Sequence, residues 1–463
     1  MYSTHLRETI QVPRRAADCY RYLKDFSTIE QWDPGVYRAE KITPGVVQVG
    51  TEFRLILNSF GRHLPMTYRM IEMESDRRLR LIGVADGLQA DDHIEIKPLG
   101  KHRSAIIYEA RLTFLSWPSF AGVIARPLLV KIGKDAVRGL ARALTGKASK
   151  PQRSSAPTLA QRLILPSAMR FTESGYLRMP DRAHSHFLDG RTIVITGPTS
   201  GIGLAAACEL ARLGARLVLV GRGQGRLEQA AERIQDFSGE PNGIRLVEAD
   251  LSDVQQIDRA AAAILQSEPR IDVLINNAGA LFAQREMTAD GFERSLSINL
   301  LAPMRLTSRL LPALQKSRGR VINVSSGGQY LQPLKIDDLN YEEDDFEGAK
   351  AYARAKRGLV ALTRSLAKQH PGVGFHSMHP GWVATPGVSK SLPEFNRLMK
   401  PFLRDARMGA DTIVWLCAED ARTLGSGNFW FDRKAQPYDV MPSTVVSEQQ
   451  LEKLVRRIEP SYS

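Results

Sequence analysis

The feature that most constrains the fold is a glycine-rich turn that joins an apolar strand to a helix. Residues 191–196 have the pattern of a buried strand, residues 197–203 contain three glycines, and an Ala- and Leu-rich helix follows. Glycines at such a turn let the backbone approach a pyrophosphate, and the N-terminus of the helix offers N–H donors and a positive dipole. Strands and helices continue to alternate after this turn, which predicts a doubly wound α/β domain with a parallel sheet.

Small or polar residues follow the strands at the edge where the carboxyl ends of parallel strands meet. Besides the first turn, an acid follows the third strand and an Asn-Asn-Ala-Gly turn follows the fourth. Open α/β sheets bind their ligands at this edge, so we expect a dinucleotide there. The expected binding residues of these turns are Gly197, Thr199, Ser200, Gly201, Ile202, Gly203, Asp250, Leu251, Asn277, Ala278 and Gly279.

The end of the second strand, Gly221-Arg222, bears on the choice between NAD and NADP. An acid at this position would bond the adenosine ribose 2′-hydroxyl and favour NAD, but no acid is present. The guanidinium of Arg222 suits a 2′-phosphate through charge-assisted, often bidentate bonding. The sequence therefore favours NADP, with Arg226 as a second candidate and a solvated loop cation as the alternative role of Arg222.

Tyr352 and Lys356 form the candidate catalytic pair, because a spacing of four residues puts both on one face of a helix. A free phenol has a pKa near ~10, which is too high for easy proton transfer at neutral pH. A neighbouring ammonium group favours the phenolate. We therefore expect Lys356 to lower the pKa of Tyr352.

These motifs, in this order, resemble the short-chain dehydrogenase/reductase (SDR) family over residues 186–463. The resemblance implies that Ser326 binds the substrate oxygen, with Ser325 as the alternative, and that Lys356 holds the nicotinamide ribose. It also implies that Asn299 supports a proton-relay water, although a structural role is the alternative. The family's nicotinamide lies against a Pro-Gly loop, which here holds Pro380, Gly381, Val383 and Thr385 and could also be a plain turn. The long insert between Ser326 and Tyr352 resembles the retinol-dehydrogenase-like branch.

The first part of the chain has a different pattern. Residues 69–73, 79–84 and 105–112 alternate like antiparallel strands, and helices are expected at 16–23 and 127–144. The order of elements and the segment 26–36 resemble the helix-grip, START-like superfamily (SRPBCC, polyketide cyclase type). The resemblance implies an α+β fold whose long helix closes a curved sheet over an apolar cavity. No catalytic group is evident in this part, so an activity of its own has no support.

The predicted domains are 1–145, a helix-grip ligand-binding domain; 146–185, a basic Ser/Pro-rich linker and SDR extension; and 186–463, the Rossmann-fold oxidoreductase domain. The chain has 63 Lys and Arg against 50 Asp and Glu, and ten of these cations but one acid lie between Arg126 and Arg170. The expected long helix at 127–144 has apolar residues on one face, namely Leu129, Ile132, Ala136, Leu140 and Leu144, and cations on the other. Its cations indicate either a solvated face or peripheral contact with an anionic membrane.

Several classes of protein are disfavoured. Aromatics are not interleaved with the cations, which argues against nucleic-acid binding. No secretory signal or spanning segment is evident, and the three cysteines lie far apart, so we expect a cytoplasmic protein with no metal site. The oligomeric state is open, a homodimer included.

The function predicted from the sequence is an NADP-dependent oxidoreductase that interconverts a carbonyl and an alcohol. The fused module suggests an apolar substrate, such as a lipid, isoprenoid, steroid-like or polyketide compound. The alternative is a lipid carrier or sensor in which the SDR part is a regulatory NADP-binding module with little turnover. The presence of all the expected catalytic side chains argues against this alternative.

Overall fold

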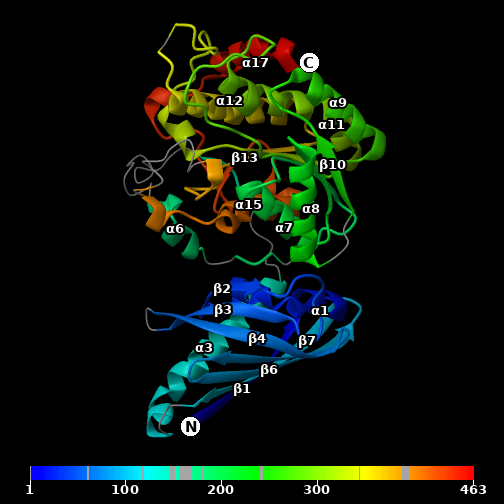
Figure 1. Ribbon diagram of the computed structural model, residues 1–463, viewed down its shortest axis with the longest axis vertical. Helices are drawn as coiled ribbons and strands as arrows, with labels where there is room; N and C mark the ends of the chain where they lie inside the picture. The colour runs from blue at the N-terminus through cyan, green and yellow to red at the C-terminus, as the bar shows by residue number, and fades with distance from the viewer. Residues whose placement is uncertain are drawn as a thin grey trace. The chain divides into compact units, whose positions relative to one another are not determined.

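The computed structural model describes residues 2–59, 62–115, 119–145, 152–155, 169–179, 182–184, 186–239, 243–343, 345–387, 397 and 399–462. The chain forms two compact units (Figure 1). The first comprises Met1–Ala148 and Pro180–His186, and the second comprises Ser149–Met179 and Phe187–Ser463. The chain therefore enters the second unit, returns briefly to the first, and then completes the second.

The first unit contains an antiparallel sheet in the order β1-β7-β6-β5-β4-β3-β2. The first and last strands pair along their whole length, from Tyr2 opposite Phe114 to Val12 opposite Ser104. Side chains on one face alternate with those on the other, and the inward set is buried, as expected for a sheet covered on one side. The strands are β1 Tyr2–Val12, β2 Val36–Lys41, β3 Glu52–Ser59, β4 Arg62–Glu74, β5 Arg78–Ala85, β6 Leu88–Gly100 and β7 Arg103–Phe114.

Helices α1 (Ala16–Lys24), α2 (Ile29–Trp32) and α3 (Ser119–Thr145) complete this unit. The long helix α3 packs against β1 and α2, and a Cβ atom at its Gly139 would lie only 1.8 Å from the Trp32 carbonyl oxygen. This close approach requires glycine. Strand, helix and sheet order confirm the predicted helix-grip architecture.

The predicted apolar face of α3 needs one correction. Ala136, Leu140 and Leu144 are buried, but Ile132 is 44% exposed. Val137 and Ala143 are buried in its place, because the packed stripe is rotated around the helix toward them. The side chain of Leu129 lies outside the described residues. No helix in the described part of the chain is both long and apolar enough to cross a membrane.

The second unit contains a sheet in the order β10-β9-β8-β11-β12-β13-β14-β15, parallel except for the last pair. The order reverses beside β8, which is the arrangement of a doubly wound fold and confirms the predicted class. The strands are β8 Thr192–Thr196, β9 Arg216–Gly221, β10 Ile244–Glu248, β11 Val273–Asn276, β12 Arg320–Val324, β13 Gly374–Met378, β14 Phe429–Phe431 and β15 Lys434–Gln436.

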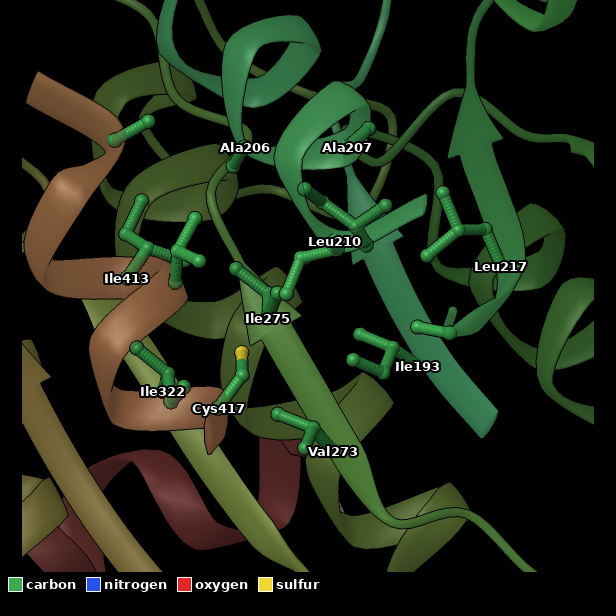
Figure 2. Close-up of a cluster of buried hydrophobic side chains, with 14 of the residues drawn as sticks. Ile193, Ala206, Ala207, Leu210, Leu217, Val273, Ile275, Ile322, Ile413 and Cys417 are labelled. Atoms are coloured by element: carbon green, nitrogen blue, oxygen red, sulfur yellow. The ribbon is translucent and has the colours of Figure 1, made fainter. Parts of the chain in front are cut away.

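Helices cover both faces of this sheet. One face packs under α7 (Gly201–Arg212), α8 (Gln224–Ser238) and α15 (Ala406–Ala418). Figure 2 shows side chains of three neighbouring strands, Ile193, Ile275 and Ile322, pointing toward Leu210 of α7 and Cys417 of α15. The other face packs under α9 (Val254–Ser267), α11 (Ala302–Ser317) and α12 (Gly348–Gln369). Further helices are α6 Glu173–Leu177, α10 Arg294–Leu296, α16 Ala421–Leu424 and α17 Glu448–Tyr462.

Parts of the predicted linker are packed into the second unit. Gln152 and Ser154 hydrogen-bond the segment around β14, and the Ser154 amide donates to Asn428 Oδ1 at 2.9 Å. Residues 169–177 form a short 3-10 turn and α6. Residues 146–151, 156–168, 180, 181 and 185 of the predicted linker lie outside the described residues.

Candidate active site

The carboxyl ends of the parallel strands surround a cavity of about 1330 Å³ in the second unit. Strands β8, β9, β11, β12 and β13 each contribute lining residues at or just beyond their ends, for example Gly197, Asn277 and Pro380. The edge of the sheet where the sequence predicts a dinucleotide is therefore hollow.

The glycine-rich turn is shaped by close backbone contacts. Gly197 has a φ of 66°, a value that disfavours residues with a side chain. A Cβ atom at Gly203 would lie 2.1 Å from the Gly197 carbonyl oxygen, so the turn and the first turn of α7 are in contact. Ser200, in extended conformation, is the N-cap residue of α7. These features leave the backbone amides at the start of α7 beside the cavity, and this arrangement fits a pyrophosphate.

The Asn-Asn-Ala-Gly turn is bonded to the glycine-rich turn. Asn277 Nδ2 donates to the carbonyl oxygens of Thr196 and Gly197, at 3.0 and 3.1 Å. The amides of Asn277 and Ala278 both donate to Thr196 Oγ1 at 3.0 Å. The two turns form one rigid wall of the cavity.

Arg222 lies on the rim of the cavity, where its side chain is 51% exposed. Its Nη1 is 3.6 Å from Asp250 Oδ2. Burial tends to raise the pKa of Asp250, but hydrogen bonds from Ser252 and the charge of Arg222 outweigh it and hold the pKa below its usual value. The guanidinium is held near the rim and remains available to an anionic ligand.

Tyr352, Lys356 and Ser326 meet at the opposite part of the cavity lining. Tyr352 and Lys356 lie on α12, and Lys356 Nζ is 5.7 Å from the centroid of the Tyr352 ring. Ser326 lies beside Tyr352 and acts to lower the pKa of its hydroxyl. Ser325 instead donates to the Lys356 carbonyl oxygen at 3.2 Å, so the geometry favours Ser326 as the partner of Tyr352.

Asn299 lies in a π-helical turn, Ser297–Leu301, between α10 and α11. Its Nδ2 donates to the carbonyl oxygens of Ala280 and Ser295, at 2.8 and 2.9 Å, and its Oδ1 accepts from the Ala280 amide. A Cβ atom at Gly279 would lie 2.7 Å from Asn299 Oδ1 and 3.1 Å from Lys356 Nζ. Glycine at 279 therefore keeps the space in front of the lysine open.

Comparisons with known proteins agree with this geometry. Residues 191–395 match the family model described as short chain dehydrogenase. Dehydrogenase/reductase SDR family member 12 of Homo sapiens is 39% identical over 302 residues, which cover 63% of this chain and 95% of the relative. The chain belongs to the short-chain dehydrogenase/reductase family. It is an SDR oxidoreductase that acts on a carbonyl or alcohol and binds NAD(P).

Two further relatives confirm the predicted branch of the SDR family. Retinol dehydrogenase 12 of Homo sapiens is 35% identical over 277 residues, covering 59% of this chain and 85% of the relative. Retinol dehydrogenase 14 of Mus musculus is 33% identical over 291 residues, covering 58% and 86%. Residues 3–145 match a different family model, described as polyketide cyclase / dehydrase and lipid transport, as the resemblance of the first part predicts.

The structure brings most of the predicted SDR site residues to the cavity. Gly201, Asp250 and Asn299 do not line it, and each supports a neighbour that does: Gly201 with its φ of 55° starts α7, Asp250 faces Arg222, and Asn299 braces the Gly279 turn. The lining residues among those predicted are Gly197, Thr199, Ser200, Ile202, Gly203, Arg222, Leu251, Asn277, Ala278, Gly279, Ser326, Tyr352, Lys356, Pro380, Gly381, Val383 and Thr385.

The sequence predicts that Lys356 lowers the pKa of Tyr352, and the structure gives the opposite direction. Burial raises the pKa of Tyr352 to about 12, and Ser326 only partly opposes the shift. Burial also lowers the pKa of Lys356 to about 7. Lys356 Nζ donates to the Val324 carbonyl oxygen at 2.9 Å and lies over the phenol ring, so its effect on the hydroxyl is smaller than that of burial.

The Pro-Gly loop is tied to a segment that precedes the Rossmann domain. The Trp382 amide donates to the Phe171 carbonyl oxygen at 2.8 Å, and Gly381 has a φ of 83°. Arg170 and Phe171 themselves line the cavity, and a Cβ atom at Gly327 would lie 3.2 Å from Phe171 Cε2. Sequence reasoning missed these two residues, because nothing local marks them as neighbours of a strand end more than 150 positions away.

Arg404 holds this segment in place. Its buried guanidinium makes a bidentate ion pair with Asp432, at 2.6 and 2.9 Å. The same guanidinium donates to the carbonyl oxygens of Arg170 and Thr172, at 2.7 and 3.1 Å. Arg404 thus links the extension, the Pro-Gly loop and the end of β14 in one network.

Proposed function

We propose that the second unit is an NADP-dependent enzyme that interconverts a carbonyl and an alcohol on an apolar substrate. The observation that carries the proposal is that Ser326, Tyr352 and Lys356 line one cavity together with Arg222. The cofactor supplies or accepts the hydride. Ser326 binds the substrate oxygen, and Tyr352 donates a proton to it in reduction or removes one in oxidation.

Lys356 has two roles in this proposal: its charge acts on Tyr352, and its Nζ binds the cofactor. Its ammonium is close enough to the phenol ring for electrostatic attraction, and Gly279 leaves its Nζ accessible from the cavity. The nicotinamide ribose hydroxyls would bond Lys356, and the Pro-Gly loop with Val383 and Thr385 would bind the carboxamide. Because the pKa of Lys356 is already lowered to about 7, binding of an electronegative group would favour its charged form.

Two arginines at the rim of the cavity support the preference for NADP. Arg222 and Arg226 both line it, and the acid that would select the 2′-hydroxyl is absent from the end of β9. Arg222 has one weak carboxylate contact, at 3.6 Å, which leaves donors for a 2′-phosphate.

An apolar substrate is supported by the walls around Tyr352. Phe171, Leu281, Phe282, Leu331, Trp382 and Met441 line the cavity. Burying the apolar surface of a substrate against these side chains would supply binding free energy of about 25 cal/mol for each Å² removed from water. Lipid-, isoprenoid-, steroid- and polyketide-like carbonyl compounds share this chemistry.

The test is a turnover assay of the whole chain with apolar aldehydes and ketones, with NADPH and NADH in parallel. We expect faster turnover with NADPH, and a loss of about 10³-fold in kcat for Tyr352→Phe, the scale of general acid–base catalysis. Tyr352→Phe should still bind NADPH, which separates lost chemistry from lost folding. Normal turnover by Tyr352→Phe would contradict the mechanism.

We also propose that α3 contacts anionic membranes through its cations. Lys131, Lys134, Arg138 and Arg142 are exposed, and one of them, Arg138, has an ion pair with Asp135 at 2.9 Å. Exposed cations near an anionic surface contribute about 1 kcal/mol each. Co-sedimentation of the whole chain with phosphatidylserine vesicles, and not with phosphatidylcholine vesicles, is the expected result. Equal binding to both would contradict the proposal.

A further inference from the structure

The interior of the first unit contains a carboxylate in a position where the strand pattern expects an apolar residue. Asp92 lies on β6 between Ala90 and Ile94, and all three side chains face inward and are buried. Its neighbour Asp91 faces the other side of the sheet, where it pairs with Arg80 at 2.9 Å. The alternation therefore separates one acid on the surface from one in the interior.

Asp92 is only partly satisfied by its surroundings. Tyr108 on β7 donates its hydroxyl to Asp92 Oδ1 at 2.7 Å. Tyr68 on β4 interacts electrostatically with Asp92. The second oxygen, Oδ2, is buried and has no hydrogen-bond partner among the described residues. A buried acceptor left in this way costs free energy unless something else binds it.

A second carboxyl group lies near the first without a cation between them. Asp33, which follows α2, interacts electrostatically with Asp92 and with both tyrosines. It accepts a hydrogen bond from the Gly35 amide at 2.7 Å and keeps some accessible surface. Neither carboxyl forms an ion pair with a described residue. Burial raises the pKa of each to about 6, so both are mainly ionised at pH 7.5.

Aromatic rings pack against the two tyrosines that interact with Asp92. The Trp32 ring meets the Tyr108 ring edge-on, with centroids 6.1 Å apart, and the Phe26 ring lies 5.0 Å from the Tyr68 ring. The indole Nε1 of Trp32 is buried and has no partner in the described part of the chain. This nitrogen is a second orphan polar group, independent of the carboxyl pair.

We propose that this interior is a binding site for the ammonium group of an amphipathic organic ligand, with Asp92 as its anchor. Two uncompensated carboxylates attract a cation, and the faces of aromatic rings do the same. Lys or Arg could fill this role from the protein, but no described residue does. The site is separate from the proposed reductase site, because every residue in it belongs to the first unit.

The experiment compares two probes that differ in charge, 2-phenylethylamine and 2-phenylethanol, by calorimetric titration of the whole chain. We expect the amine to bind at least tenfold more tightly than the alcohol. Asp92→Asn should remove this difference, and Asp91→Asn, on the opposite face of the same strand, should keep it. Thermal unfolding of both variants checks that they fold.

Three results would overturn the proposal. They are equal binding of amine and alcohol, no binding of either probe up to millimolar concentration, and a preference for the amine that survives in Asp92→Asn. Any of them would mean that Asp92 is not the anchor of an ammonium group. If Asp92→Asn does not fold, Asp33→Asn provides the same comparison, since it removes the second carboxylate while Asp92 stays.

Discussion

In the second unit, buried guanidinium groups face carboxylates. In the first unit, the buried carboxyl group of Asp92 and the partly buried one of Asp33 have no ion-pair partner among the described residues. Arg404 pairs with Asp432, and Arg433 pairs with Asp411 at 2.6 Å. Asp92 has the Tyr108 hydroxyl as its hydrogen-bond partner instead. Both arrangements remove charge from water, which costs free energy. In the second unit, ion pairing offsets part of this cost and holds the paired segments together. In the first unit the described residues do not offset it, so a bound cation would.

The largest expected effect comes from breaking a pair in the second unit. Arg404→Leu leaves Asp432 buried without its guanidinium and releases the backbone of Arg170 and Thr172. Breaking a buried pair from one side costs about 3–5 kcal/mol. Chemical denaturation should show this loss, and hydrogen exchange should be faster in residues 169–177.

The matched control is Arg422→Leu. Its side chain is 94% exposed, and its nearest carboxylate contact, with Asp420, is 3.5 Å long. Exposed pairs contribute less than about 1 kcal/mol, so little change is expected. If both variants lose a similar free energy of unfolding, burial does not make the Arg404–Asp432 pair more important than an exposed pair.

A smaller effect, of opposite sign, is expected when an unpaired charge is removed from the first unit. Asp92→Asn keeps an acceptor for Tyr108 but removes the buried charge. The pKa of Asp92 is raised to about 6 in the folded chain, so the folded state binds the proton more tightly than the unfolded state. The wild-type domain therefore loses stability as the pH rises through about 6, and a shift of about two pKa units corresponds to roughly 3 kcal/mol.

We thus expect Asp92→Asn to be more stable than the wild type by about 2 kcal/mol at pH 7.5, with no advantage at pH 4. Hydrogen exchange of β6 and β7 amides at the two pH values measures the difference. Asp91→Asn loses the contacts of Asp91 with Arg80 and His93 on the other face of the sheet, and it should not gain stability at pH 7.5. A variant less stable than the wild type at pH 7.5 would contradict the account of an uncompensated charge.

The smallest expected effect on stability is at the rim of the cavity, where Arg222 and Asp250 are paired but partly exposed. Arg222→Ala should change the free energy of unfolding by less than about 1 kcal/mol. Its Kd for NADPH should rise about tenfold, the loss of one charge-assisted hydrogen bond, and its Kd for NADH should change little. Fluorescence titration with each dinucleotide measures these Kd values, and Arg226→Ala is the comparison variant. If Arg222→Ala weakens the binding of NADPH and NADH equally, Arg222 does not bind the 2′-phosphate.

The Rossmann domain was predictable because its motifs are local. Gly197 and Gly203 are close in sequence and constrain one turn, and Tyr352 and Lys356 share one helix face. The helix-grip fold was expected from a family resemblance, which rests on the order of the elements and on the segment 26–36. The exact buried stripe of α3 did not, because Ile132 fits the helical period but lies outside the packed surface.

The missed features depend on contacts between distant segments. Phe171 lines the cavity, and its carbonyl oxygen accepts a hydrogen bond from the Trp382 amide. Arg404 binds the carbonyl oxygens of the neighbouring Arg170 and Thr172, and no spacing rule relates these segments. Asp92 follows another acid, Asp91, and only the placement of β6 in the folded sheet shows that Asp92 faces inward. The pKa of Tyr352 depends on the depth of a cavity, a quantity that sequence spacing does not contain.

The path of the chain between the units has a consequence for how the protein can be divided. Residues 149–179 belong to the second unit, and residues 180–186 return to the first. A cut at residue 186 would leave Arg404 without two of the carbonyl groups that it binds, and would strip Gln152 and Ser154 from β14. A cut at residue 148 would separate His184 from the first unit, which would then lose the hydrogen bond from the His184 amide to Gln31 Oε1. Each unit is built from two separate stretches of the chain, so neither can be excised as a single uninterrupted stretch.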